Sequence, residues 1–137
     1  HICGVTKLTE ESLGRDELPP EPITPIIRSY GSHSTDQKKG FCPAKRVSRG
    51  GFSAIPYGAL IPDEFDNVLA SGRCISVDEC VMDTIRMMTT CMVTGQAAAI
   101  AASIVIEGDL STMTQVPYAG LRRGLLDMDC ILEPKAK

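Results

Sequence analysis

The residues best suited to chemistry gather around Arg86, which precedes the longest uncharged stretch of the chain, residues 87–106. Thr89 and Thr90 follow the arginine closely, and the spacing of apolar residues beyond them predicts a helix that begins there. The first N–H groups of a helix have no acceptor within the helix and carry partial positive charge. This end of the helix is therefore suited to an anionic or electron-rich group.

Small residues inside the same stretch would let another body approach closely. The run Gly95-Gln96-Ala97-Ala98 leaves room for a second backbone or a flat ligand. Residues three and four apart mark one face: Ile85, Met88, Met92, Gly95, Ala99, Ala102 and Ile106. Because the other faces are small or apolar too, the helix should be buried on all sides. A chain of 137 residues can hardly surround it, so we expect a larger assembly or a longer polypeptide.

A helix of this length could also span a bilayer. Its bulk is Ala, it contains several Thr, a Gln and a Ser, and no aromatic or basic pair flanks it as an interfacial anchor. We therefore predict no membrane span. The net charge of −3 gives no reason to expect nucleic acid or an anionic membrane as partner.

The elements that must position this helix are short. Residues 1–8 predict a short strand or extended segment, and Thr9 is suited to be the N-cap of a short helix. Residues 14–52 form a Pro/Gly-rich loop with one short apolar piece, and residues 52–62 form an extended segment that prolines keep from being a central strand. Residues 66–72 predict a buried strand that ends at Gly72. An amphipathic helix follows near Pro117 and runs to about Met128, with Leu121, Leu125 and Met128 in its apolar stripe.

The spacing of the cysteines predicts free, reduced thiols and not a metal site. The six Cys residues form no CxxC pair, and neither His1 nor His33 has zinc-finger spacing to them. An uncharged helix around Cys91 favours a reduced core thiol. No basic flank and apolar run marks a leader at the start of the chain. We expect no metal and a cytoplasmic location.

The order of several motifs resembles one family. "IPYGALIPDEFDNVLASGRCIS", followed by "IRMMTTCMVTGQAAAIAA", is similar to the C-terminal flavin-binding segment of FAD-dependent oxidoreductases related to the fumarate reductase and succinate dehydrogenase flavoproteins. The opening "HICGVTKLTEESL" also resembles that family. The sequence departs from the family in two ways. It has no G-x-G-x-x-G fingerprint for the ADP half of FAD, and it has Ala99 where the family usually has Gly.

The resemblance implies FAD as cofactor and gives roles to individual residues. Arg86 would face the substrate, and His33 and Tyr57 could assist as acid or base. The residues implied to line or support the flavin are Gly72, Arg73, Ile75, Ser76, Thr90, Cys91, Gly95, Gln96 and Ala98. Simpler roles stay open: Arg73 could pair with Asp78 or Glu79, Arg86 with Asp83, and Tyr57 could serve packing only.

The implied fold class is α/β: part of a Rossmann-like FAD-binding domain of the glutathione-reductase type, incomplete without a partner or an upstream chain. We expect residues 1–53 to lie on the substrate side and residues 54–137 to form the C-terminal part of the FAD-binding domain. The implied function is hydride transfer between a small organic molecule and FAD, with a larger chain that carries the dinucleotide-binding motif. The alternative is a non-catalytic assembly subunit of a flavoprotein complex.

Overall fold

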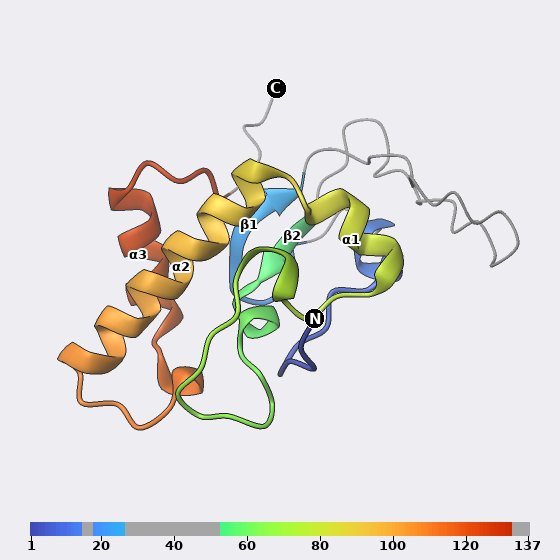
Figure 1. The fold of residues 1–137 in the computed structure, drawn as a ribbon. Helices are drawn as coiled ribbons and strands as arrows, with labels where there is room; N and C mark the ends of the chain where they lie inside the picture. Colours follow the sequence, from blue (N-terminus) through green and yellow to red (C-terminus); the bar gives the residue numbers. More distant parts are fainter. Residues whose placement is uncertain (15–17, 27–52, 133–137) are drawn as a thin grey trace, which may run out of the picture.

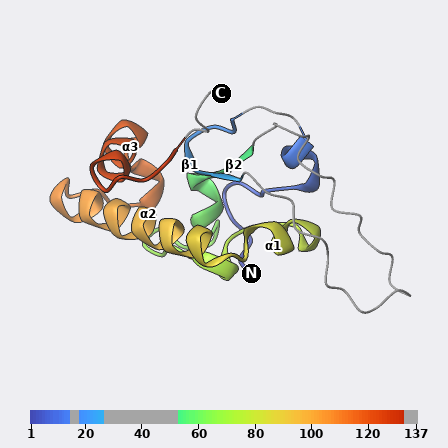
Figure 2. The same ribbon diagram turned by 90° about the horizontal axis from the view of Figure 1, so that it is seen from above.

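The computed structural model describes residues 1–14, 18–26 and 53–132. Three α-helices and one small sheet make up the regular structure of this part of the chain (Figure 1): α1 (Glu79–Ile85), α2 (Met88–Glu107), α3 (Tyr118–Asp127), β1 (Pro22–Ile26) and β2 (Ser53–Pro56). Figure 2 shows α2 lying along one side of the sheet, with α3 beside its C-terminal half. The fold is therefore organised around α2.

The sheet consists of β1 and β2 paired antiparallel, with Ile26 opposite Ser53. A parallel Rossmann-type sheet is not present in the described ranges. β1 lies inside the segment that we expected to be loop. Pro22 and Pro25 are tolerated there because a sheet of two strands has only edge strands. The segment predicted to be extended over residues 52–62 is a strand only over Ser53–Pro56, and the prediction is wrong for Tyr57–Leu60, which form a 3-10 helix.

The N-terminal segment is extended, as predicted, and is tied to two distant parts of the chain. Gly4 forms a bridge with Pro62, and Leu8 forms one with Val77. The predicted short helix is present as a 3-10 helix over Glu10–Gly14. The Thr9 and Ser12 hydroxyls lie 3.0 Å apart across its first turn.

The predicted buried strand over residues 66–72 is wrong. Residues 66–71 are irregular, and Phe65 and Val68 are exposed. The Ala70 N–H donates to the Leu60 carbonyl, but the segment does not pair with either strand of the sheet. A strand needs a neighbouring strand to satisfy its backbone groups, and apolar side chains alone do not supply one.

The long helix begins where the sequence predicted. Residue Arg86 ends α1, Met87 is extended with a ψ of 150°, and α2 starts at Met88. The predicted apolar face of α2 is, however, its exposed face: Met88 is 82% exposed, Met92 68% and Ile106 79%. The buried face consists of Thr94, Ala97 and Ala101. The described chain fully buries these small residues, buries several large residues of α2 in part, and leaves Met88, Met92 and Ile106 exposed.

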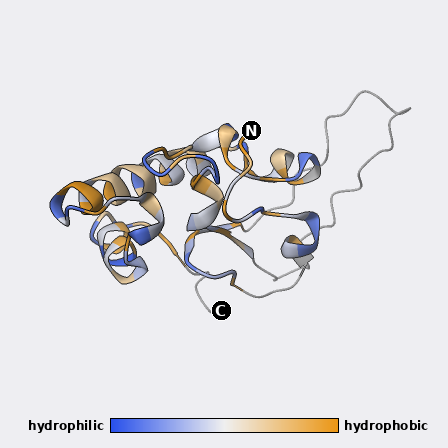
Figure 3. Ribbon diagram, turned by 90° about the horizontal axis from the view of Figure 1, so that it is seen from below, coloured by the Kyte–Doolittle hydropathy of each residue, from blue (hydrophilic) through white to orange (hydrophobic). Residues whose placement is uncertain are grey.

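Length and composition alone would allow α2 to cross a membrane. Figure 3 shows apolar colours along most of the helix. A core helix of a soluble protein passes the same test, so the feature is weak evidence for a membrane, and the absence of a span stays a prediction.

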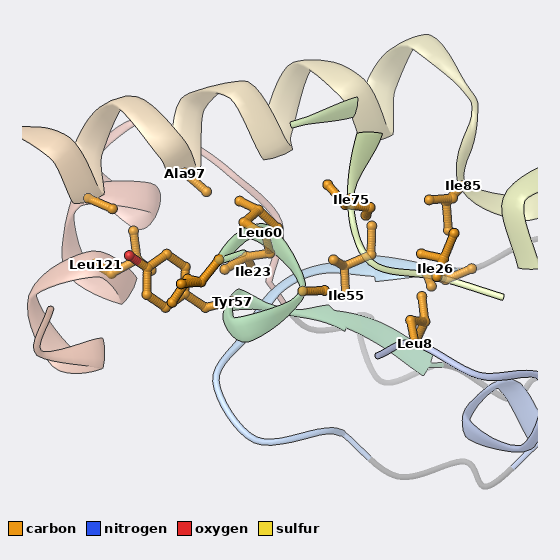
Figure 4. Close-up of a cluster of buried hydrophobic side chains, with 14 of the residues drawn as sticks. Leu8, Ile23, Ile26, Ile55, Tyr57, Leu60, Ile75, Ile85, Ala97 and Leu121 are labelled. Atoms are coloured by element: carbon orange, nitrogen blue, oxygen red, sulfur yellow. The ribbon is translucent and has the colours of Figure 1, made fainter. Parts of the chain in front are cut away.

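One apolar core joins the N-terminal segment, the sheet and the helices. Figure 4 shows Ala97 of α2 above Ile23, Leu60 and Tyr57, with Leu121 of α3 beside them. The core also contains Leu8, Ile26, Ile55, Ile75, Val77, Ile85 and Leu125. α3 therefore buries its predicted stripe at Leu121 and Leu125, whereas the predicted third member, Met128, is exposed.

Candidate functional site

Gly72 forms a turn that is seated on the N-terminal half of α2. Its φ is +65°, in the left-handed region where glycine is favoured. Its N–H donates to the Thr94 hydroxyl oxygen at 2.9 Å. A Cβ at this position would lie 3.4 Å from the sulfur of Cys91. Gly72 begins a 3-10 helix over Gly72–Cys74 and does not end a strand as predicted, and its contact with a flavin stays a prediction.

Thr94 is the site residue that the sequence did not reveal. Its side chain is fully buried, and its oxygen also lies 3.0 Å from the carbonyl oxygens of Thr90 and Cys91. In the sequence it is one of several hydroxyl residues in an apolar helix, so nothing distinguished it from Thr89 or Thr90. A helical Thr commonly bonds a carbonyl three or four residues back, but any Thr of the helix could do so, and the sequence held no signal for the bond from Gly72.

The first turn of α2 offers backbone N–H groups. Its N-cap, Met87, supplies no side-chain hydrogen bond to them. The Met87 carbonyl accepts the Cys91 N–H at 3.0 Å, which closes the first helical turn. Met88 and Thr89 are exposed and Thr90 is half-buried, so this helix end is open to an approaching group. The helix dipole makes it favourable for negative charge.

The two candidate arginines lie on different elements. Arg86 is half-buried at the junction of α1 and α2, and its backbone N–H donates to the Met82 carbonyl. Arg73 follows Gly72 and is exposed. Asp78, a possible partner of Arg73, pairs instead with Lys7 at 2.6 Å. The side chain of Asp83, the possible partner of Arg86, lies outside the described part of the structure.

Ile75 and Ser76 face the core. Both are buried, and the Ser76 backbone bonds the Ala59 carbonyl on one side and the Leu8 N–H on the other. Their side chains are turned away from solvent, and a flavin contact by these two residues stays a prediction.

Gly95, Gln96 and Ala98 lie in three different environments. A Cβ at Gly95 would meet no atom within 4 Å, so the helix surface there is open. The Gln96 side chain accepts a hydrogen bond from the Cys130 thiol at 3.4 Å. Burial, and after it the charge of Asp129, raises the pKa of that thiol, which keeps it a donor. Ala98 packs against the edge of the core. Gly95 alone among the three leaves space for another body.

Tyr57 is engaged in packing. It is buried, and its hydroxyl donates to the Met113 carbonyl at 3.0 Å. Burial, and then the charge of Glu21, raises the pKa of Tyr57 to about 12. Such a phenol is a poor proton donor near neutral pH, which favours the packing alternative. His33, the other candidate acid or base, lies outside the described residues.

Residues 1–14, 18–26 and 53–132 hold no group of His, Cys, Asp or Glu side chains that could bind a metal ion. Four cysteines there have free thiols: Cys3, Cys74, Cys91 and Cys130. The expectations of no metal and of reduced cysteines stay predictions.

The site therefore consists of a left-handed glycine turn held against an uncapped helix start, with an arginine before it and an apolar helix face beyond it. Comparisons with curated proteins and with solved structures found no match. The model of one family, described as FAD dependent oxidoreductase, matches residues 1–125. Since this match covers most of the 137 residues, the chain belongs to the FAD dependent oxidoreductase family.

Proposed function

We propose that this chain is the C-terminal portion or a small subunit of an FAD-dependent oxidoreductase and completes the flavin pocket for hydride transfer between an organic substrate and FAD. The observation that carries the proposal is the Gly72 turn, bonded to Thr94 beside the uncapped start of α2. The family match over residues 1–125 supports FAD as the cofactor.

The residues of this turn and helix fit a flavin in shape and charge. Gly72 has no side chain to obstruct a flat ring, and its left-handed backbone would strain any replacement. When bound, FAD accepts or donates two electrons and a proton, and negative charge develops on the ring as it is reduced. The α2 N–H groups would stabilise that charge, and Arg86 would bind or polarise the substrate.

The missing part of the pocket would come from another chain or from upstream sequence. The 137 residues hold no G-x-G-x-x-G fingerprint, which flavoproteins of this kind need for the ADP half of FAD. The exposed side chains of Met88, Met92 and Ile106 would then pack against that body. A small-molecule substrate and a cytoplasmic location belong to the same proposal.

One observation favours the second candidate, a non-catalytic assembly subunit. The Tyr57 hydroxyl is tied to the Met113 carbonyl, so a proposed acid or base is committed to packing. The uncovered face of α2 would then serve assembly alone.

The experiment purifies the chain together with the other chain or upstream sequence that completes the pocket, and measures flavin absorbance and turnover. We expect bound FAD in the wild type and at least about tenfold weaker FAD binding in Gly72→Val, because a β-branched residue is strained at positive φ. Gly120→Ala is the matched control, since a Cβ there would meet only Ile104, at an ordinary 3.5 Å.

Arg86→Gln separates the two candidate functions. In an enzyme it should retain FAD and lose turnover, because the charge that binds substrate is gone. In an assembly subunit, neither Gly72→Val nor Arg86→Gln changes the turnover of the complex. Wild-type protein that carries no flavin when fully assembled would reject the proposal.

A further inference from the structure

The Thr94 hydroxyl connects two parts of the site that are far apart in sequence. Its oxygen accepts the Gly72 N–H at 2.9 Å and lies 3.0 Å from the carbonyl oxygens of Thr90 and Cys91. A hydroxyl has one proton to donate and two lone pairs. The proton goes to a carbonyl of α2, which turns a lone pair toward Gly72. The hydroxyl orientation is thus fixed by the helix, and the turn is fixed by the hydroxyl.

The turn has a second point of contact beneath it. A Cβ added at Gly72 would lie 3.4 Å from the sulfur and 3.6 Å from the Cβ of Cys91, so the turn faces that side chain. A side chain larger than a methyl group at position 72 would therefore press against Cys91. The Thr94 bond sets where along the helix the turn sits, because it anchors one N–H to one turn of α2.

We propose that Thr94 is a positioning residue of the flavin site, whose hydroxyl holds the Ser71–Arg73 segment in register with the start of α2. The inference rests on the proposed function, because it concerns the same flavin site. The Gly72 backbone and the first N–H groups of α2 then meet the ring as one rigid unit. Thr94 itself is fully buried and acts only through Gly72.

Thr94→Val tests the proposal, because valine has the shape of threonine without its hydroxyl. In the assembled flavoprotein we expect amide hydrogen exchange in residues 70–74 to become about tenfold faster, the equivalent of one hydrogen bond. FAD affinity should fall by a similar factor. Thr94→Ser restores the hydroxyl and should return FAD affinity to within about threefold of the wild type.

A matched control is available one helix earlier. Thr84 of α1 is also buried, and its hydroxyl has no hydrogen-bond partner among the described residues. Thr84→Val makes the same chemical change without removing a bond, so exchange in residues 70–74 and FAD affinity should stay at wild-type values. Circular dichroism checks that each variant folds, and Thr94→Ala carries the test if Thr94→Val does not fold.

Two results would overturn the positioning role while the proposed function stands. One is wild-type exchange of residues 70–74 in Thr94→Val, which would mean that the bond does not hold the turn. The other is faster exchange with unchanged FAD affinity, which would mean that the flavin does not depend on the turn. A wild-type assembly that binds no FAD would overturn the proposed function and this inference with it.

Discussion

The two faces of α2 have the same apolar character and opposite surroundings. One face, with Ala97 and Ala101, is fully buried against the rest of the chain. The other carries Met88, Met92 and Ile106, which are 82%, 68% and 79% exposed. Other large side chains of α2 pack partly against the core, whereas these three are left largely exposed. Their exposure supports the proposal that a second body packs on α2.

The energies involved are large for a chain of this size. Fully burying one Met or Ile side chain contributes about 1.5–3 kcal/mol. Three such side chains would together contribute an amount comparable to the lower end of the stability of a whole domain, about 5 kcal/mol. Leaving these three side chains in water is therefore unfavourable. The small residues on the inner face allow α2 to pack closely on the sheet and α3.

The largest expected effect comes from a charge on the inner face. Ala101→Asp would bury a carboxylate without a partner and should lower the free energy of unfolding of the chain by about 3–5 kcal/mol. Ala99→Asp is the matched control on the exposed face, where the loss should stay near the difference in helix propensity, below about 0.7 kcal/mol. Urea unfolding measures both. Equal losses would show that the two faces do not differ in burial.

Effects of intermediate size are expected at two glycines, one in close contact with a neighbouring helix and one facing open space. A Cβ at Gly124 of α3 would lie 2.7 Å from Ile100 of α2, so Gly124→Ala should destabilise the chain by about 1–3 kcal/mol. A Cβ at Gly95 would meet open space, so Gly95→Ala should stabilise the chain by about 0.5–1 kcal/mol. Thermal unfolding checks the opposite signs. A stabilising Gly124→Ala would contradict the close packing of α2 and α3.

Local sequence signals predicted the elements that depend on local chemistry. The start of α2 after Arg86 and the inward stripe of α3 at Leu121 and Leu125 agree with the structure. Both follow from residue spacing, and neither depends on a distant partner.

Elements that depend on distant partners were not predictable in the same way. β1 pairs with residues about thirty positions later, and its burial does not alternate as in a regular strand because the register is irregular between Pro22 and Thr24. Residues 66–71 have strand-like composition and no neighbouring strand in the described structure. For the site, Gly72 was named because the resemblance to the family implied it, whereas Thr94 was missed because its bond to Gly72 spans 22 positions.

Which face of α2 is buried also lay beyond the sequence, since periodicity identified a stripe without saying what covers it. Met92→Lys tests whether another body covers the exposed face. In the chain alone it should change the free energy of unfolding by no more than about 0.5 kcal/mol, because the side chain is already 68% exposed. In the assembled flavoprotein the same lysine would be forced against an apolar surface, so FAD retention should fall at least about tenfold. Met92→Leu keeps the apolar character and should leave both quantities near wild type. If Met92→Lys assembles and retains FAD as well as Met92→Leu, the outer face of α2 stays in water, and the two faces differ for a reason other than a partner.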